Sequence, residues 1–261
     1  MCRLGKWGCA LCVAGMLFSY AMDRNFMENE EVLAQELEEF EETVDIARLV
    51  PETDPMSWYY KLMEKRFLRG QSPEAKKYEV ALAVNADVIG YIRIPESRVD
   101  YPIVYSGDNE YYLARNVSGE ADAHGAIYLD AFSHGVWGRV NLVHGHSMLD
   151  GTMFKDVLKY VSQEWYEAHK DIKVFDGKED RVYEVFAVYI LDSSKENIQL
   201  YYEDENAFVN WLIEIIDRSI VRGGVVRDRE DLLVLNTCSY QFSGAHTIVV
   251  ASRREDGSSV G

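Results

Sequence analysis

The pattern of apolar and polar positions divides the chain into an N-terminal part with helical spacing and a later part with short strand-like runs. Between Met27 and Val50, apolar residues recur at roughly helical spacing within an acidic segment. A second helix-like pattern runs from Ser57 to Arg69 and ends at Gly70. We interpret Gln71 to Lys77 as a linker, so the compact domain is expected from about residue 78 onward.

From residue 78, short apolar runs alternate with turn-forming residues, a pattern that predicts β-strands. The eight predicted strands are Val88–Ile94, Tyr101–Val104, Ala126–Asp130, Arg139–His144, Ile172–Phe175, Arg181–Leu191, Leu232–Thr237 and Thr247–Ala251. An amphipathic helix is predicted over Glu205–Ser219, between the sixth and seventh strands. The expected fold class is therefore mostly β with flanking helices, and eight short strands favour a closed barrel or a sandwich.

The first 22 residues predict a membrane segment. Arg3 and Lys6 precede Trp7 to Met22, a run without a charged residue. Basic residues before an apolar run are typical of a signal anchor or a secretory signal, and a buried N-terminal helix is the alternative. The run is shorter than the ~20 residues of a usual span. The expected domains are an anchor at 1–22, a helical stalk or N-terminal helices at 23–77, a catalytic barrel at 78–254 and a tail at 255–261.

Composition narrows the classes of partner. The chain has 261 residues, of which 48% are hydrophobic, enough for a substantial core. The formal net charge of −17 argues against a nucleic-acid partner, because phosphate binding requires clustered Lys and Arg. Cys238 is the only cysteine beyond residue 12, which excludes a disulfide within the part after the apolar segment.

Cys238 and two histidines roughly ninety residues before it indicate thiol chemistry. Cys238 ends the apolar run that begins at Leu232, and His144 and His146 lie in the segment Val-His-Gly-His-Ser-Met. A thiolate nucleophile with an imidazole partner accounts for this combination, because the two groups meet in space rather than in sequence. A buried structural cysteine is one alternative. A zinc site formed by both histidines and Cys238 is another, but it lacks an evident fourth ligand, so no metal is predicted.

Several motifs, in order, resemble those of the class B sortases, which are membrane-anchored cysteine transpeptidases of Gram-positive bacteria. The motifs are Asn85-Ala-Asp-Val-Ile-Gly-Tyr91, Asp100-Tyr-Pro-Ile-Val104, Asp108-Asn-Glu-Tyr-Tyr-Leu113, Gly145-His-Ser-Met148 with Gly151-Thr-Met-Phe154, and Leu235-Asn-Thr-Cys238. The resemblance covers roughly residues 78 to 252. It implies an eight-stranded sortase-type barrel with N-terminal helices and a long helix before the seventh strand.

The resemblance also implies roles for individual residues. Cys238 matches the family's nucleophile, and His146 matches its catalytic histidine. The residues expected along the substrate groove are Asn109, Leu113, Asn236 and Ser239.

The chain departs from the family at one catalytic position. Class B sortases typically have an arginine eight residues after the cysteine, and this chain has His246 there. His246 could replace the arginine by donating a ring N–H, or another arginine such as Arg139 or Arg227 could reach the site. The third alternative is a chain that binds sorting signals without turning them over.

The expected function is that of a membrane-anchored transpeptidase with an extracellular catalytic domain. Cys238 would cleave a sorting signal resembling Asn-Pro-x-Thr-(Asn/Gly) through a thioester, and a peptidoglycan or pilin amine would receive the surface protein. No cofactor is expected. The alternatives are a noncatalytic module that binds sorting signals and an exported cysteine hydrolase.

Overall fold

The computed structural model describes residues 72–133 and 136–254, which lie in a compact unit that begins at Leu68. The described helices are α4 (Pro73–Val84), η3 (Tyr111–Ala114), η4 (Phe154–Val161), α5 (Gln163–Ala168) and α6 (Glu205–Asp217). The strands are β1 (Val88–Arg93), β2 (Asp100–Val104), β3 (Ile127–Leu129), β4 (Val140–His144), β5 (Asp171–Phe175), β6 (Asp180–Asp192), β7 (Leu232–Cys238) and β8 (Ala245–Arg254).

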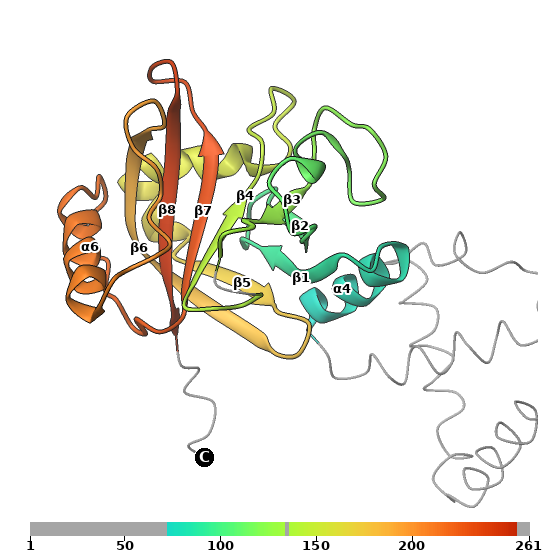
Figure 1. The fold of residues 1–261 in the computed structure, drawn as a ribbon, viewed down its shortest axis with the longest axis horizontal. Helices are drawn as coiled ribbons and strands as arrows, with labels where there is room; N and C mark the ends of the chain where they lie inside the picture. Colours follow the sequence, from blue (N-terminus) through green and yellow to red (C-terminus); the bar gives the residue numbers. More distant parts are fainter. Residues whose placement is uncertain (1–71, 134–135, 255–261) are drawn as a thin grey trace, which may run out of the picture. The chain divides into compact units, whose positions relative to one another are not determined.

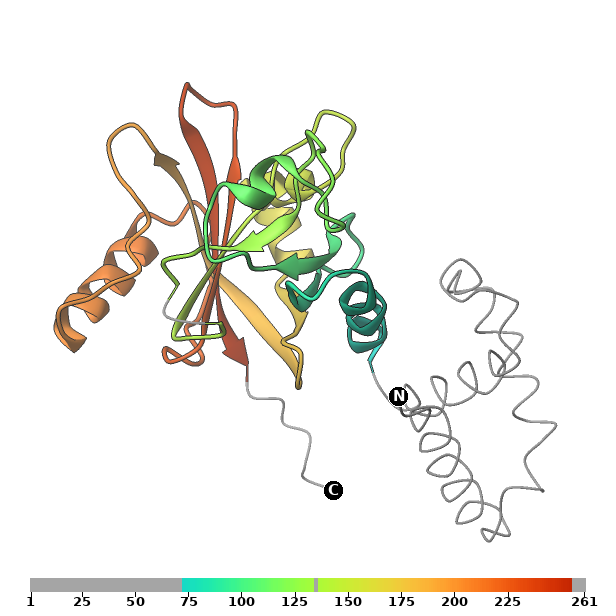
Figure 2. The same cartoon turned by 45° about the vertical axis from the view of Figure 1, so that its right-hand side comes forward.

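The eight strands form a closed barrel in the order β1-β2-β3-β4-β7-β8-β6-β5. All neighbouring strands are antiparallel except two parallel pairs, β2 with β3 and β4 with β7. The mostly β class, the eight strands and the helix before the seventh strand are therefore confirmed, and closure decides between the barrel and the sandwich. Figure 1 shows α6 beside β6 and α4 near β1, and Figure 2 shows the same arrangement after rotation.

Alternation along each strand produces an inner and an outer apolar layer, because successive side chains point to opposite faces. The inner layer fills the barrel and includes Val143, Leu235 and Val249. An outer layer over β4, β7 and β8 packs against α6, from which Phe208 and Trp211 contribute the largest side chains. The helix thus covers only one region of the outer surface.

The linker prediction for residues 71–77 is wrong in its described part, because α4 begins at Pro73 and crosses the boundary predicted at residue 78. The Oγ of Ser72 accepts a hydrogen bond from the Ala75 backbone N–H, and proline occupies the first helical position. Ala75 and Tyr78 pack on the barrel, where the Tyr78 ring contacts Phe175. The segment Ser72-Pro73-Glu74 is therefore the start of a helix and not part of a linker.

The predicted anchor and stalk, residues 1–22 and most of 23–77, lie outside the described residues. Within the ranges that the structure describes, no helix is both long and apolar enough to span a membrane.

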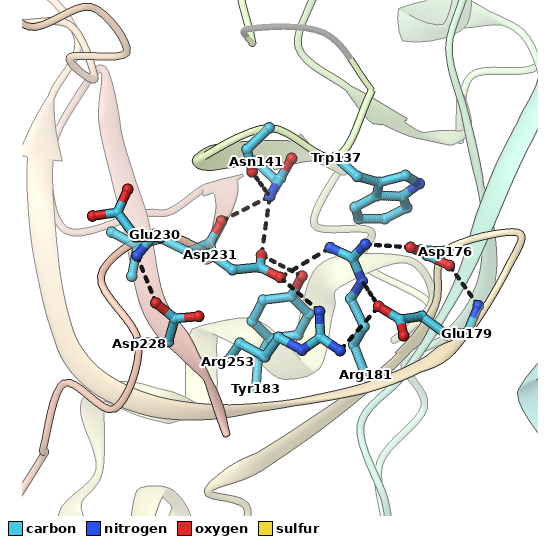
Figure 3. A network of polar contacts seen from close by, with 12 residues as sticks. Trp137, Asn141, Asp176, Glu179, Arg181, Tyr183, Asp228, Glu230, Asp231 and Arg253 are labelled. Atoms are coloured by element: carbon cyan, nitrogen blue, oxygen red, sulfur yellow. Dashed lines mark hydrogen bonds and ion pairs between the residues drawn. The ribbon is translucent and has the colours of Figure 1, made fainter. Parts of the chain in front are cut away.

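A largely buried network of charged side chains lies beside the beginning of β7 (Figure 3). Arg181 forms ion pairs with Asp176 and, at 2.9 Å, with Asp231, the residue before β7. The Tyr183 hydroxyl donates to Asp231 at 2.8 Å, and Arg253 of β8 lies 3.5 Å from the same carboxylate. Burial, and then the Asp231 charge, raises the pKa of Tyr183, which keeps this hydroxyl a donor.

Arg181→Met should lower the free energy of unfolding by about 3–5 kcal/mol, because it leaves the buried Asp176 without its cation and leaves Asp231 with only Arg253, 3.5 Å away. Urea denaturation followed by tryptophan fluorescence measures the change. The control is Arg227→Met, which removes a more exposed ion pair with Glu184 and should have a much smaller effect. Equal urea midpoints for the two variants would show that the network does not stabilise the barrel.

Candidate active site

Cys238 is exposed because the outer face of β7 changes from apolar to polar near its end. Leu235 points into the barrel, whereas Val234 packs outward beneath α6. Asn236 and Cys238 have the parity of Val234 and therefore lie on the outer face. The apolar cover ends at this point, and the thiol is presented to solvent on a rigid strand. The alternative of a buried structural cysteine is thereby excluded.

His246 lies directly opposite Cys238 in the antiparallel pair β7–β8. The distance from the Cys238 Sγ to the His246 Nε2 is 3.9 Å, at the outer limit of a hydrogen bond to sulfur. Within the described part of the chain, this is the hydrogen bond that Cys238 makes, and none joins it to His146. His246, at the position where the motif resemblance predicts an arginine, is thus the imidazole beside the thiol.

A series of side-chain hydrogen bonds extends from His246 of β8 through β7 and β4 to Asp130, the residue after β3. The His246 Nδ1 lies 2.8 Å from the Asn236 Oδ1, and the Asn236 Nδ2 lies 2.9 Å from the His144 Nδ1. The His144 Nε2 lies 2.8 Å from the Asp130 Oδ2. His144 pairs with Asn236 in the parallel β4–β7 register, which places the two side chains side by side. The ring of Tyr128 stacks on that of His144 at 5.0 Å and restricts its plane.

Asp130 is an ionised acceptor at the end of this series. Burial alone would raise its pKa, but hydrogen bonds from His144, the Phe132 backbone N–H and Asn109 outweigh burial and lower the pKa of Asp130. The Asn109 amide donates to Asp130 at 3.0 Å, and its oxygen accepts from the Ala131 backbone N–H. The same carboxylate, with burial as the larger cause, raises the pKa of Tyr128 to about 12.

His146 faces a different element. Its Nε2 lies 2.8 Å from the backbone carbonyl oxygen of Leu113 in η3. Gly125 permits this approach, because a Cβ there would lie 2.8 Å from that oxygen and 3.1 Å from the His146 Cδ2. Gly145 separates the two histidines for a similar reason, since a Cβ would lie 2.4 Å from Ile127.

The remaining residues expected in the groove are brought near the site in different ways. Leu113 is exposed, while Ser239 is buried next to Cys238. The amides of Asn109 and Asn236 are already engaged in the hydrogen bonds described above. Substrate contacts by these four residues stay predictions. Asp130 and the link through Asn236 were not predicted from the sequence, although the carboxylate at the end of the predicted strand Ala126–Asp130 was an available signal.

The arginines considered as replacements lie at the other end of the strands. Arg139 immediately precedes β4 and forms ion pairs with Glu205 and Glu230. It lies five residues, about 16 Å along the strand, before His144. Arg227 pairs with Glu184. The expectation that Arg139 or Arg227 could reach the thiol is therefore wrong.

The zinc alternative gains no support from this geometry. His144 and His146 bond to different partners, Asp130 and Leu113. In residues 72–133 and 136–254, no group of three or more His, Cys, Asp or Glu residues is arranged to hold a metal ion.

The chain is similar to known proteins over most of its barrel. Residues 92–255 match the sortase domain. Sortase B of Listeria monocytogenes is 30% identical over 157 residues, which cover 59% of this chain and 64% of the relative, so the chain spans less than two thirds of that protein. Sortase B of Staphylococcus aureus is 28% identical over 208 residues, covering 74% of this chain and 82% of the relative.

Solved structures share the fold. The Clostridium perfringens sortase B structure superposes with a TM-score of 0.64 at 24% identity, covering 68% of this chain and 99% of that chain. A Staphylococcus aureus sortase B–substrate complex superposes with a TM-score of 0.65 at 22% identity, covering 75% and 93%.

Fold and site together define a closed β-barrel protein that presents a thiol beside an imidazole on its outer surface. Because the sortase domain matches residues 92–255, which include most of the barrel, the chain belongs to the sortase family. Its curated relatives and its structural neighbours are sortases B, which confirms the class B resemblance found in the motifs.

The two described histidines with shifted pKa values should titrate on opposite sides of the ordinary value. Burial, and then the nearby His144 ring, lowers the pKa of His246 below 6.5. Hydrogen bonds to Asp150 and then to Asp122 raise the pKa of His124 above 6.5. In an NMR titration, His246 should therefore stay neutral to a lower pH than His124. The reverse order would contradict the burial of the His246 ring.

Proposed function

We propose that this chain is a membrane-anchored cysteine transpeptidase that attaches surface proteins to the cell wall. The observation that carries the proposal is the exposed Cys238 Sγ, 3.9 Å from an imidazole nitrogen, in a chain of the sortase family. Thiols attack carbonyl carbons as thiolates, and an adjacent imidazole accepts the proton.

The proposed substrate is a sorting signal resembling Asn-Pro-x-Thr-(Asn/Gly). Cys238 attacks the threonine carbonyl and forms a thioester, and the amine of the following residue leaves. An amino group of a peptidoglycan precursor or of a pilin then attacks the thioester and receives the surface protein. No cofactor takes part in this reaction.

Exposed apolar side chains support a peptide ligand. Tyr240 follows Cys238 by two residues and is 64% exposed, and Phe132 follows Asp130 by two residues and is 77% exposed. Leu113, whose carbonyl binds His146, is also exposed. Exposed apolar side chains on the segments that carry Cys238, Asp130 and the His146 contact suit the proline and aliphatic parts of a sorting signal.

His246 is the observation that favours a second candidate, a noncatalytic module that binds sorting signals. Arginine carries a permanent charge and a fork of donors that histidine lacks. If this position must supply an arginine, the chain binds the signal and does not cleave it.

The detergent-solubilised full chain should cleave quenched fluorescent peptides containing Asn-Pro-x-Thr-Asn or x-Pro-x-Thr-Gly, and Cys238→Ala should abolish the cleavage. Adding triglycine should produce the peptide–triglycine conjugate, measured by mass spectrometry. If adding triglycine changes neither the cleavage rate nor the products, the chain is a hydrolase. Saturable binding of the peptides without cleavage identifies the noncatalytic module.

The apolar run Trp7 to Met22 motivates the proposed location, with the catalytic barrel outside the cell. Deleting residues 1–22 should move the protein from the membrane fraction to the soluble fraction of a bacterial host. A protease added to intact protoplasts should degrade the barrel of the full chain. Protection of the barrel from that protease would contradict an extracellular orientation.

A further inference from the structure

The direction of proton donation along the Asp130–His144–Asn236–His246 series follows from its carboxylate end. An ionised carboxylate accepts hydrogen bonds only, so His144 donates to Asp130 from its Nε2. In the neutral ring, this leaves the His144 Nδ1 as an acceptor. The group facing it must then be the Asn236 NH2, as observed at 2.9 Å.

The same reasoning continues to the thiol. With its NH2 directed at His144, Asn236 turns its carbonyl oxygen to the His246 Nδ1, 2.8 Å away. A carbonyl oxygen accepts only, so the neutral His246 ring carries its proton on Nδ1. The unprotonated Nε2 therefore faces the Cys238 Sγ. An unprotonated nitrogen accepts a proton and does not donate an N–H.

We propose that His246 is the general base and acid for Cys238, and that Asn236, His144 and Asp130 are positioning residues that set its tautomer. This assignment rests on the proposed transpeptidase function and assigns to His246 a role different from that of the arginine whose position it occupies. The same order of groups, thiol, imidazole and amide, occurs in papain-like proteases on an unrelated fold.

The proposed steps balance. The His246 Nε2 takes the Sγ proton, and the thiolate attacks the carbonyl carbon. The imidazolium gives that proton to the departing amine nitrogen as the C–N bond breaks and the thioester forms. The acceptor amine then attacks the thioester, the new C–N bond forms and the C–S bond breaks. The attacking amine gives its proton to Nε2, and transfer of that proton from Nε2 to Sγ restores the starting thiol and neutral imidazole.

His146 is less suited to this role in the observed geometry. Its Nε2 donates to the Leu113 carbonyl, and in the described chain its ring makes no hydrogen bond to the thiol. Burial, and then the His144 ring, lowers the pKa of His246, which leaves its Nε2 unprotonated near pH 7 and therefore available as a base.

Few other charges face the His246 ring. From β4 the titratable neighbour is His144, and from β7 it is Cys238. On β6, Leu191 lies directly opposite, and the next residue, Asp192, is paired with Lys195. The pH response of the pair is therefore dominated by the two reacting groups.

The test compares two substitutions that keep each histidine's existing hydrogen bond and remove its imidazole. In His246→Asn, the side-chain amide replaces the Nδ1 donor toward Asn236, and in His146→Gln it replaces the Nε2 donor toward Leu113. Iodoacetamide modification of Cys238 in the full chain is followed by peptide mass spectrometry. At pH 6.5, His246→Asn should slow modification by about 10-fold or more, because it removes the Nε2 that takes the Sγ proton, and a lone thiol with a pKa of about 8.5 is almost entirely protonated at this pH. At pH 9.5 it should differ from the parent by less than about 3-fold.

His146→Gln should leave both rates within about 3-fold of the parent. A larger loss at pH 6.5 in His146→Gln than in His246→Asn, or no loss in His246→Asn, overturns the assignment. Neither measurement requires a sorting peptide. If the chain cleaves peptides but its thiol reactivity depends on His146, this inference is overturned and the proposed function stands. If the chain does not cleave peptides, the proposed function fails, and the modification rates still decide which histidine acts on Cys238.

The positioning residues have their own readout. Long-range proton–nitrogen NMR spectra of histidine-labelled protein should show His246 as the Nδ1–H tautomer and His144 as the Nε2–H tautomer. Asp130→Asn should convert a substantial fraction of His246 to Nε2–H, because the series no longer ends in a pure acceptor. The control Asp150→Asn, which contacts His124 instead, should leave both tautomers unchanged. His246 as Nε2–H in the parent overturns the proposal.

Discussion

The site depends on the register in which β4, β7 and β8 pair. The parallel β4–β7 pairing sets His144 beside Asn236, and the antiparallel β7–β8 pairing sets Cys238 beside His246. A shift of one residue in either pair would turn the affected polar side chains toward the core, where leucine and valine now lie. The apolar inner layer therefore determines the positions of the reactive groups, because its residues set the register of these strands.

Both ends of β7 are constrained, by different means. At its beginning, Asp231 is held by Arg181 and Tyr183 in a buried network. At its end, Asn236 is bonded on both sides, and Ser239 just beyond the strand bonds to β8 through its backbone. The exposed thiol thus stands on a strand that is fixed along its whole length, which limits the distances it can sample relative to His246.

Local patterns were sufficient to predict the strands, α6 and the candidate thiol. Alternation of apolar and polar residues, amphipathic helical spacing and an isolated cysteine can each be recognised within a short stretch of sequence. The start of α4 was also encoded locally, by Ser72 and Pro73, but was misjudged as a linker. The series from His246 to Asp130 could not be predicted this way. Its members are separated by up to 116 residues, from Asp130 to His246, and meet only through a strand order and register that short sequence patterns do not reveal.

The polar series and the inner core use side chains of opposite parity on the same strands. A substitution on the outer face therefore changes the chemistry of the surface without altering the volume packed inside the barrel. Natural variation can act on one face at a time, and the scaffold can keep its fold while exchanging one proton-handling group for another. Such a separation allows His246 to occupy the position where the motif resemblance predicts an arginine, and it makes this edge of the barrel a favourable place for redesign.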